Sequence, residues 1–160
     1  MARERDIVNA VAAALDDTGL FDGIFPWALK DASDESADAT RAVVISPIGG
    51  HVEDRHDSVV GDGANDGEMI QRGRIRLVFL SRDADKQVRD ESAGRLLEAA
   101  KDAINGRGLV RYLGEGVIYP QWTRVLSWKW DEPQPPQRGI EAVFEYAIDA
   151  PGWNLFDTSE

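Results

Sequence analysis

Two histidines and several carboxylates gather in one glycine-rich stretch of the chain, and residues of these types could bind a metal ion. His51 and His56 lie beside Glu53, Asp54 and Asp57. Imidazole and carboxylate groups are common zinc ligands. However, a spacing of five does not place two histidines on one face of a helix, and the glycines and acids around them are typical of a solvated loop. We therefore predict no metal site here.

Two other short stretches resemble ligand-binding loops only in part. The sequence DGANDGE, which begins at Asp62, is similar to a calcium loop, but Ala64 and Gly73 stand where an EF-hand needs oxygen ligands. The sequence ISPIGGH lacks the lysine and the following helix of a phosphate-binding loop. No Ser-His-Asp arrangement is evident either. We expect no catalytic residues, no cofactor and no enzymatic activity.

A row of arginines is the most distinctive charged feature. Arg72, Arg74 and Arg76 stand at alternate positions in the stretch IQRGRIRLVFLSRD, which covers residues 70–83. Apolar residues at Ile75, Leu77 and Phe79 point to the other side, which is the pattern of a half-buried strand. The arginine side could be a solvated surface, a nucleic-acid contact, or a surface that pairs with acidic residues of a neighbouring subunit. A formal net charge of -11 disfavours duplex DNA, because the phosphate backbone rewards positive charge.

The preceding segment supplies the acidic residues that such pairing would need. We predict a long acidic loop at residues 47–69, and a loop of that length inside a compact domain is usually functional or mobile. We therefore predict a subunit or partner interface that combines the arginine row with the acids of this loop. The candidate interface residues are Arg72, Arg74, Arg76, Glu53, Asp54, Asp57, Asp62, Asp66 and Glu68.

Three tryptophans near the C-terminal end of the chain form an aromatic stripe. Trp122, Trp128 and Trp130 share the face of a predicted strand with Leu126. Beside arginines they could stack nucleic-acid bases, as in single-strand binders. We expect them instead to cover the sheet beneath the helices, because large aromatic side chains are frequent in cores.

The predicted elements alternate between helices and short strands. A helix with an apolar stripe at Ile7, Val8, Val11, Ala12 and Leu15 ends near Thr18. A second helix begins near Ser81 or Asp83 and runs to about Asn105, with an apolar stripe at Val88, Ala93, Leu96, Leu97, Ala100, Ala103 and Ile104. Strands are predicted at about 24–29, 41–46, 70–81, 109–113, 117–120, 121–130 and 139–148, of which the last two form the longest antiparallel pair.

The boundaries between these elements follow from turn and breaker residues. Pro26 indicates an edge or irregular strand, and residues 31–40 are typical of a solvated loop. Pro47 with Gly49 and Gly50 is expected to end the strand that begins at Arg41. Two helices and several strands in this order predict an α+β fold, a mainly antiparallel sheet with both helices packed on one face.

Composition agrees with one folded domain. The chain has 160 residues, of which 42% are hydrophobic, and no cysteine, which rules out disulfides and thiolate chemistry. No apolar run is long enough to span a bilayer, so we expect a soluble protein without a membrane partner. The predicted organisation is a single domain over residues 1–150 and a C-terminal tail over residues 151–160.

The order of elements resembles that of the tail terminator (tail completion, head-to-tail joining) proteins of long-tailed bacteriophages. The features that carry the resemblance are the first helix, FDGIFPW with the strand after it, the long loop, and the alternating strand that leads into DADKQVRDESAGRLLEAAKDAI. The terminal strands QWTRVLSWKW and IEAVFEYAI complete it. The resemblance extends from about Asp6 to Ile148 and lies in element order and size.

This resemblance implies a subunit that assembles into a hexameric ring on the tail tube. The ring would halt tube polymerisation, contact the tail tube protein and the head-tail connector protein, and let genomic DNA pass through its channel. The protein would then reside in the virion, at the head-tail junction, after assembly in the host cytoplasm. Another neck or tail-tube protein of a phage-like particle, and a small nucleic-acid-binding module, are the alternatives.

Overall fold

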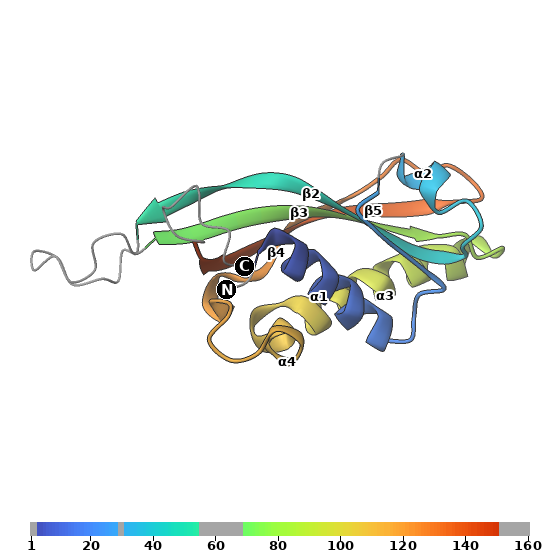
Figure 1. The fold of residues 1–160 in the computed structure, drawn as a ribbon. Coiled ribbons are helices and arrows are strands. Elements are labelled where there is room, and N and C mark those ends of the chain that lie inside the picture. The colour runs from blue at the N-terminus through green and yellow to red at the C-terminus, as the bar shows by residue number, and fades with distance from the viewer. Residues whose placement is uncertain (1–2, 29–30, 55–68, 151–160) are drawn as a thin grey trace, which may run out of the picture.

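The computed structural model describes residues 3–28, 31–54 and 69–150 of the chain. The helices and strands are α1 (Glu4–Asp17), β1 (Gly23–Pro26), α2 (Ala32–Glu35), β2 (Arg41–Asp54), β3 (Met69–Ser81), α3 (Lys86–Ile104), α4 (Val110–Leu113), β4 (Arg124–Trp130) and β5 (Arg138–Asp149) (Figure 1). Two short 3-10 helices, η1 (Gly106–Leu109) and η2 (Pro120–Trp122), lie between α3 and β4.

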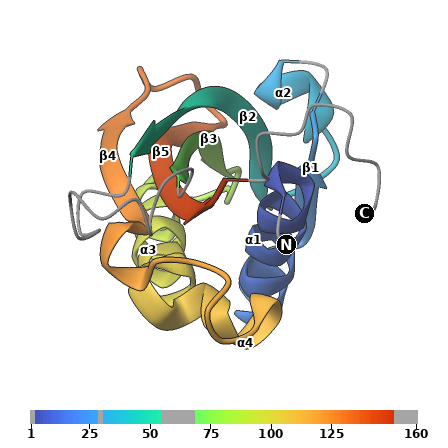
Figure 2. The ribbon, with the colours of Figure 1, turned by 60° about the vertical axis from the view of Figure 1, so that its left-hand side comes forward.

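The five strands form one sheet in the order β1-β2-β3-β5-β4. The pair β1–β2 is parallel, and the other three pairs are antiparallel. Helices α1, α3 and α4 lie along one side of this twisted sheet, as Figures 1 and 2 show. The predicted α+β fold with two helices packed on one face of a mainly antiparallel sheet is therefore confirmed.

The core forms where the apolar side of β3 packs against the apolar stripes of α1 and α3. Ile75, Leu77 and Phe79 of β3 are fully buried on the side of the sheet that faces the helices. They belong to one apolar cluster with the α3 residues Leu96, Leu97, Ala100 and Ile104 and the α1 residues Ile7, Val11 and Leu15. Alternation along the strand and 3.6-residue spacing along the helices therefore place most of the residues inside that the sequence predicted there.

The strand that begins at Arg41 does not end at Pro47, as the sequence predicted. A β-bulge between Pro47 and Gly49 shifts the register, and β2 then continues along β3 as far as Asp54. A bulge accommodates proline because the ladder of hydrogen bonds is already interrupted there. The predicted loop at 47–69 is thus strand at both ends, and residues 55–68 lie outside the described part. The longest antiparallel pair is β2–β3 rather than β4–β5.

The two short strands predicted after α3 are also wrong. Residues 106–113 form η1 and α4, in which Leu109 is buried and Leu113 packs against the same core. These two side chains are four residues apart, so helical spacing accounts for the pattern that was interpreted as a strand. Ile118 makes only a single bridge to Ile148, and η2 follows it.

The remaining differences concern the start of α3, one of its side chains, and an additional helical turn. Asp85 caps α3, with its side chain accepting a hydrogen bond from the backbone N–H of Val88 at 3.0 Å, so the helix begins after the predicted Ser81 or Asp83. Val88 itself is exposed, although it was predicted in the apolar stripe. The acidic segment at 31–40 contains one helical turn, α2, that the sequence did not predict.

Gly73 leaves space for the ring of Tyr146, its register partner on β5. A methyl group at Gly73 would lie 2.2 Å from the ring of Tyr146, which is fully buried. We expect Gly73→Ala to lower the free energy of unfolding by about 1–3 kcal/mol, the usual cost of overpacking a core. Urea denaturation measures this, and Gly94→Ala is the control, because a methyl group there would lie no closer than 3.8 Å to another side chain.

Burial of Tyr146 also predicts a loss of stability at alkaline pH. Burial, reinforced by the charge of Glu4, raises the pKa of this phenol to about 12. The folded chain then disfavours the phenolate, so stability is complete below the ordinary pKa near 10 and falls as the pH rises toward 12. The loss should reach about 2–3 kcal/mol, and Tyr146→Phe should remove it. Equal alkaline sensitivity of the two proteins would contradict the assignment.

Candidate functional site

The arginine row lies on the side of the sheet that α1 and α3 do not cover. This open face carries, among others, Ser46, Arg72, Arg74, Arg76, Glu141 and Glu145. Alternation puts the arginines there because Ile75 and Leu77 occupy the core side of the same strand. The side chains of Arg74 and Arg76 are 57% and 50% exposed, whereas that of Arg72 is 20% exposed. Arg74 and Arg76 are therefore accessible to a partner, whereas Arg72 is largely covered.

Each arginine of the row pairs with a carboxylate of the same chain. Arg72 Nε lies 2.7 Å from Glu53 Oε1 of β2, and Arg72 Nη1 lies 3.6 Å from Glu145 Oε1 of β5. Glu145 also accepts a hydrogen bond from Arg74 Nε at 3.3 Å. Thus a single buried carboxylate on β5 holds two arginines of β3.

A second set of contacts continues across the sheet. Arg76 Nη1 lies 3.5 Å from Glu141 Oε1, and the other oxygen of Glu141 lies 3.5 Å from Lys129 Nζ on β4. Positive and negative side chains therefore alternate between neighbouring strands. The open face is close to charge balance along the row, in contrast to the positive stripe that the sequence alone suggested.

Glu53 connects the row to β2. Its carboxylate accepts from Arg72 and is 2.9 Å from His51 Nε2. Hydrogen bonds from the side chains of His51 and Arg72 hold the pKa of Glu53 below its ordinary value. These contacts favour the ionised carboxylate, so Glu53 is a fixed negative partner of the row at neutral pH.

The tryptophans lie differently from the prediction. Trp122 is on η2 rather than on the strand, and the guanidinium of Arg72 lies 4.8 Å from its ring centre. Trp128 and Trp130 face the helices, but they are 47% and 44% exposed. They are half-exposed because β4 is the edge strand, where α3 covers only one side of each ring. Lys101 and Arg138 lie over the rings of Trp128 and Trp130, respectively.

The structure brings together only part of the predicted interface. Arg72, Arg74 and Arg76 share one face with Glu53, and Asp54 is the last residue of β2. Asp57, Asp62, Asp66 and Glu68 lie outside the described residues. Sequence reasoning missed Glu141 and Glu145, although their spacing of four in an alternating strand puts both on the open face. Whether this face meets a neighbouring subunit stays a prediction.

Neither metal binding nor membrane insertion gains support from the described residues. Within residues 3–28, 31–54 and 69–150, no three His, Cys, Asp or Glu side chains are grouped so that they could hold a metal ion. His51 pairs with Glu53, and His56 lies outside that part. None of the described helices is long and apolar enough to cross a membrane.

The sequence matches no protein-family model and no curated protein. Among solved structures, the chain is similar to one from a structure described as "Virion of native gene transfer agent (GTA) particle". The two chains share 18% sequence identity with a TM-score of 0.46, and the match covers 88% of this chain and 86% of that chain. Identity and score at this level transfer no function, so function has to be inferred from the residues of this chain.

Proposed function

We propose that the chain is a structural protein of a phage-like particle, in which it forms a ring on the end of the tail tube. The ring ends tail polymerisation and joins the tail to the head. The observation that carries this proposal is the long strand β2, which pairs with β3 as far as Asp54 but is covered by β1 on its outer side only as far as Ile45. Together with β3 and β5, its far end reaches beyond the helices (Figure 1). A long uncovered strand edge lets one subunit contact another without unfolding its own core.

The uncovered part of β2 exposes apolar side chains that a neighbour could cover. Ile48 and Val52 are 53% and 45% exposed, although most other apolar side chains of the described strands are buried. Exposed apolar side chains on an uncovered strand favour contact with another protein surface. Helices α1 and α3 hold the sheet in one packed core, which gives the subunit a fixed body that carries this strand edge.

The partners follow from this role. The ring would be a homo-oligomer, most simply a hexamer, that contacts the tail tube protein on one side and the head-tail connector protein on the other. Genomic DNA would pass through its channel, and the protein would reside at the head-tail junction of the virion. A nucleic-acid-binding module is less well supported, because the arginines of the row already pair with Glu53, Glu141 and Glu145.

A deletion strain tests the proposal. Without this chain, particles imaged by electron microscopy should show overlong tails that carry no heads, because nothing stops tube growth or offers a surface to the head. Expression of the intact chain from a plasmid should restore normal particles. Tails of normal length joined to heads would contradict the proposal. Short or absent tails would instead identify another neck or tail-tube protein.

A further inference from the structure

A hollow of about 580 Å³ lies at one end of the open face. Figure 2 shows α2 and the connection between β4 and β5 on two sides of this end of the sheet. Apolar side chains of β2 and β3 line the floor of the hollow, where Val78 is partly exposed and Val44 and Leu80 are buried. Its volume is in the range of sites that bind several side chains or a small ligand.

The rim of this hollow is acidic. Four carboxylates line it, those of Asp31, Asp131, Glu132 and Glu141, together with the single guanidinium of Arg76. Arg76 already pairs with Glu141, as does Lys129. Asp131 makes no side-chain hydrogen bond and no ion pair with any residue that the structure describes, although Lys129 and Arg138 attract its charge. The residues that line this acidic hollow therefore carry more negative than positive charge.

The charge on Asp131 costs stability in the free chain. Burial, and then repulsion from Glu141, raise the pKa of this carboxyl above its ordinary value, and attraction to Lys129 and Arg138 offsets only part of the rise. A carboxylate with a raised folded pKa destabilises the fold when it ionises, so the chain gains stability as the pH falls through that value. Asp83 is the opposite case, because hydrogen bonds from Arg41 lower its pKa. A cation placed in the acidic hollow would remove the penalty at Asp131.

We propose that the acidic hollow binds a basic segment of another protein. A lysine or arginine of that segment lies between Asp131 and Glu132, and an apolar neighbour lies on Val78, the floor residue that is partly exposed. The apolar floor and the acidic rim together match a peptide that carries both kinds of side chain. A nucleic acid would be repelled by the rim, and a second copy of a chain with a net charge of -11 is a poor partner for it. This inference does not rest on the proposed ring.

A peptide titration tests the inference on the full chain. The probe is a short peptide of alternating lysine and leucine, blocked at both ends, and backbone amide NMR signals report where it binds. We expect saturable shifts confined to the lining of the acidic hollow, and none with the glutamate-leucine counterpart. The double variant Asp131→Asn, Glu132→Gln should weaken binding roughly fourfold or more, from about two- to fivefold for each exposed charge pair.

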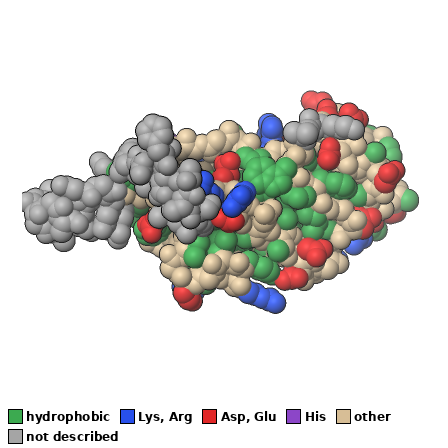
Figure 3. All heavy atoms as spheres, viewed as in Figure 1, with side chains coloured by type: hydrophobic (Ala, Val, Ile, Leu, Met, Phe, Trp, Pro, Cys, Tyr) green, Lys and Arg blue, Asp and Glu red, His purple; other side chains and the backbone are tan. Residues whose placement is uncertain are grey.

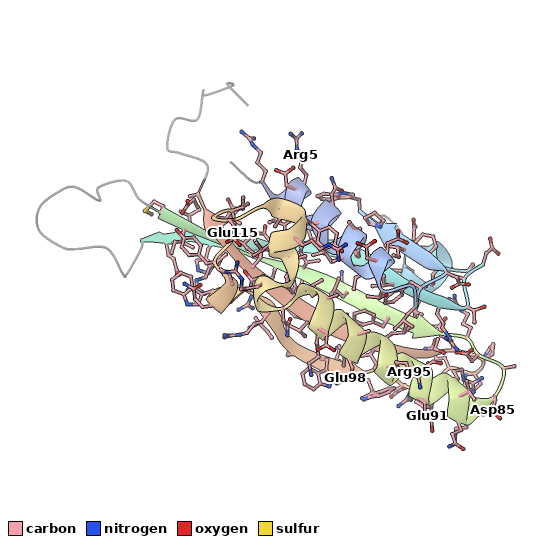
Figure 4. All side chains as sticks on the ribbon, turned by 90° about the horizontal axis from the view of Figure 1, so that it is seen from below. Arg5, Asp85, Glu91, Arg95, Glu98 and Glu115 are labelled. Atoms are coloured by element: carbon pink, nitrogen blue, oxygen red, sulfur yellow. The ribbon has the colours of Figure 1, made fainter. Side chains whose placement is uncertain are left out.

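The matched control changes two acids on α3. Glu91 and Glu98 lie on the side of α3 away from the sheet (Figure 4), and Glu91→Gln, Glu98→Gln makes the same change in net charge. This control should bind the peptide as tightly as the parent chain. In addition, Asp131→Asn should raise the melting temperature, whereas a structural carboxylate would lower it when replaced.

Several results would overturn the inference. They are the absence of shifts, shifts that survive the double variant, equal weakening by the α3 control, and a lower melting temperature for Asp131→Asn. Shifts of the hollow residues on raising the protein concentration alone would assign the site to a second copy of the chain, which also contradicts it. The space-filling view in Figure 3 shows acidic side chains at the end of the molecule where α2 lies. Because salt screens attraction between exposed charges, the test should also include a series of salt concentrations.

Discussion

Leu97→Ala is expected to lower the free energy of unfolding by about 2–5 kcal/mol, the range for deleting a large aliphatic side chain from a core. Leu97 is 3% exposed and belongs to the cluster in which α3 packs on the sheet. Truncation would leave a cavity between α3 and the sheet, because the β3 side chains opposite, such as Leu77, are themselves fully buried and have little freedom to fill it. Chemical denaturation of the parent and the variant measures the difference.

Val88→Ala is the matched control for this prediction. Val88 lies on the same helix but is 45% exposed, so its truncation should change stability by less than about 0.5 kcal/mol. A similarly small effect for Leu97→Ala would mean that α3 does not pack on the sheet through this residue. Alanine has the highest helix propensity, so neither variant weakens the helix itself, and the pair isolates the effect of burial.

The sequence predicted β3 and α3 well because each pattern is long and each has one clear period. In β3, buried residues alternate with more exposed ones from Gly73 to Phe79, and α3 repeats apolar residues along a helix of nineteen residues. The sequence predicted an end of β2 at Pro47, because Pro47 and Gly49 locally disfavour a continuous strand. In the fold, β3 supplies hydrogen-bond partners on both sides of a bulge, so tertiary pairing outweighs the local signal. The propensities of the residues in β2 contain no information about its partner strand β3.

The candidate site shows the same limit. Alternation correctly placed Arg72, Arg74 and Arg76 on one face, since a strand allows only two directions for its side chains. Their partners Glu141 and Glu145 depend on the register between β3 and β5, which sequence patterns do not determine. Likewise, alternation placed Trp128 and Trp130 on the helix side, whereas their exposure follows from β4 being an edge strand. A sequence pattern predicts which face of the sheet a side chain occupies more reliably than it predicts which residues surround that side chain.

Reversal of the whole arginine row should therefore damage the subunit as well as any interface. With Arg72, Arg74 and Arg76 all changed to glutamate, new carboxylates would stand against Glu53, Glu141 and Glu145. The side chain of Glu145 is only 10% exposed. We expect a loss of about 3–5 kcal/mol, the range for breaking a buried ion pair, measured by denaturation of the isolated chain. Unchanged stability would show that these contacts contribute little in solution.

A milder change isolates the role of the row in assembly. Arg74→Gln, Arg76→Gln removes the two most exposed charges of the row, whose surface pairs each contribute about 0–1 kcal/mol, and keeps Arg72 on Glu53 and Glu145. The subunit should stay folded. If the row contacts an acidic surface of a neighbour or of the tail tube, this variant should cap tails poorly, because a small loss at each contact is repeated around the ring. Complementation of the deletion strain and electron microscopy measure capping.

Arg5→Gln, Arg95→Gln is the control, because both side chains lie on the helix side of the molecule (Figure 4) and the change in net charge is the same. It should cap tails normally.

The charge balance of the open face also allows a different placement, since arginines already paired with glutamates would hold passing DNA only weakly. In that case the row would line the channel, and Arg74→Gln, Arg76→Gln would leave capping intact while it changes DNA retention. That outcome would contradict the predicted protein interface, because the same residues cannot both lie against a partner and face the channel.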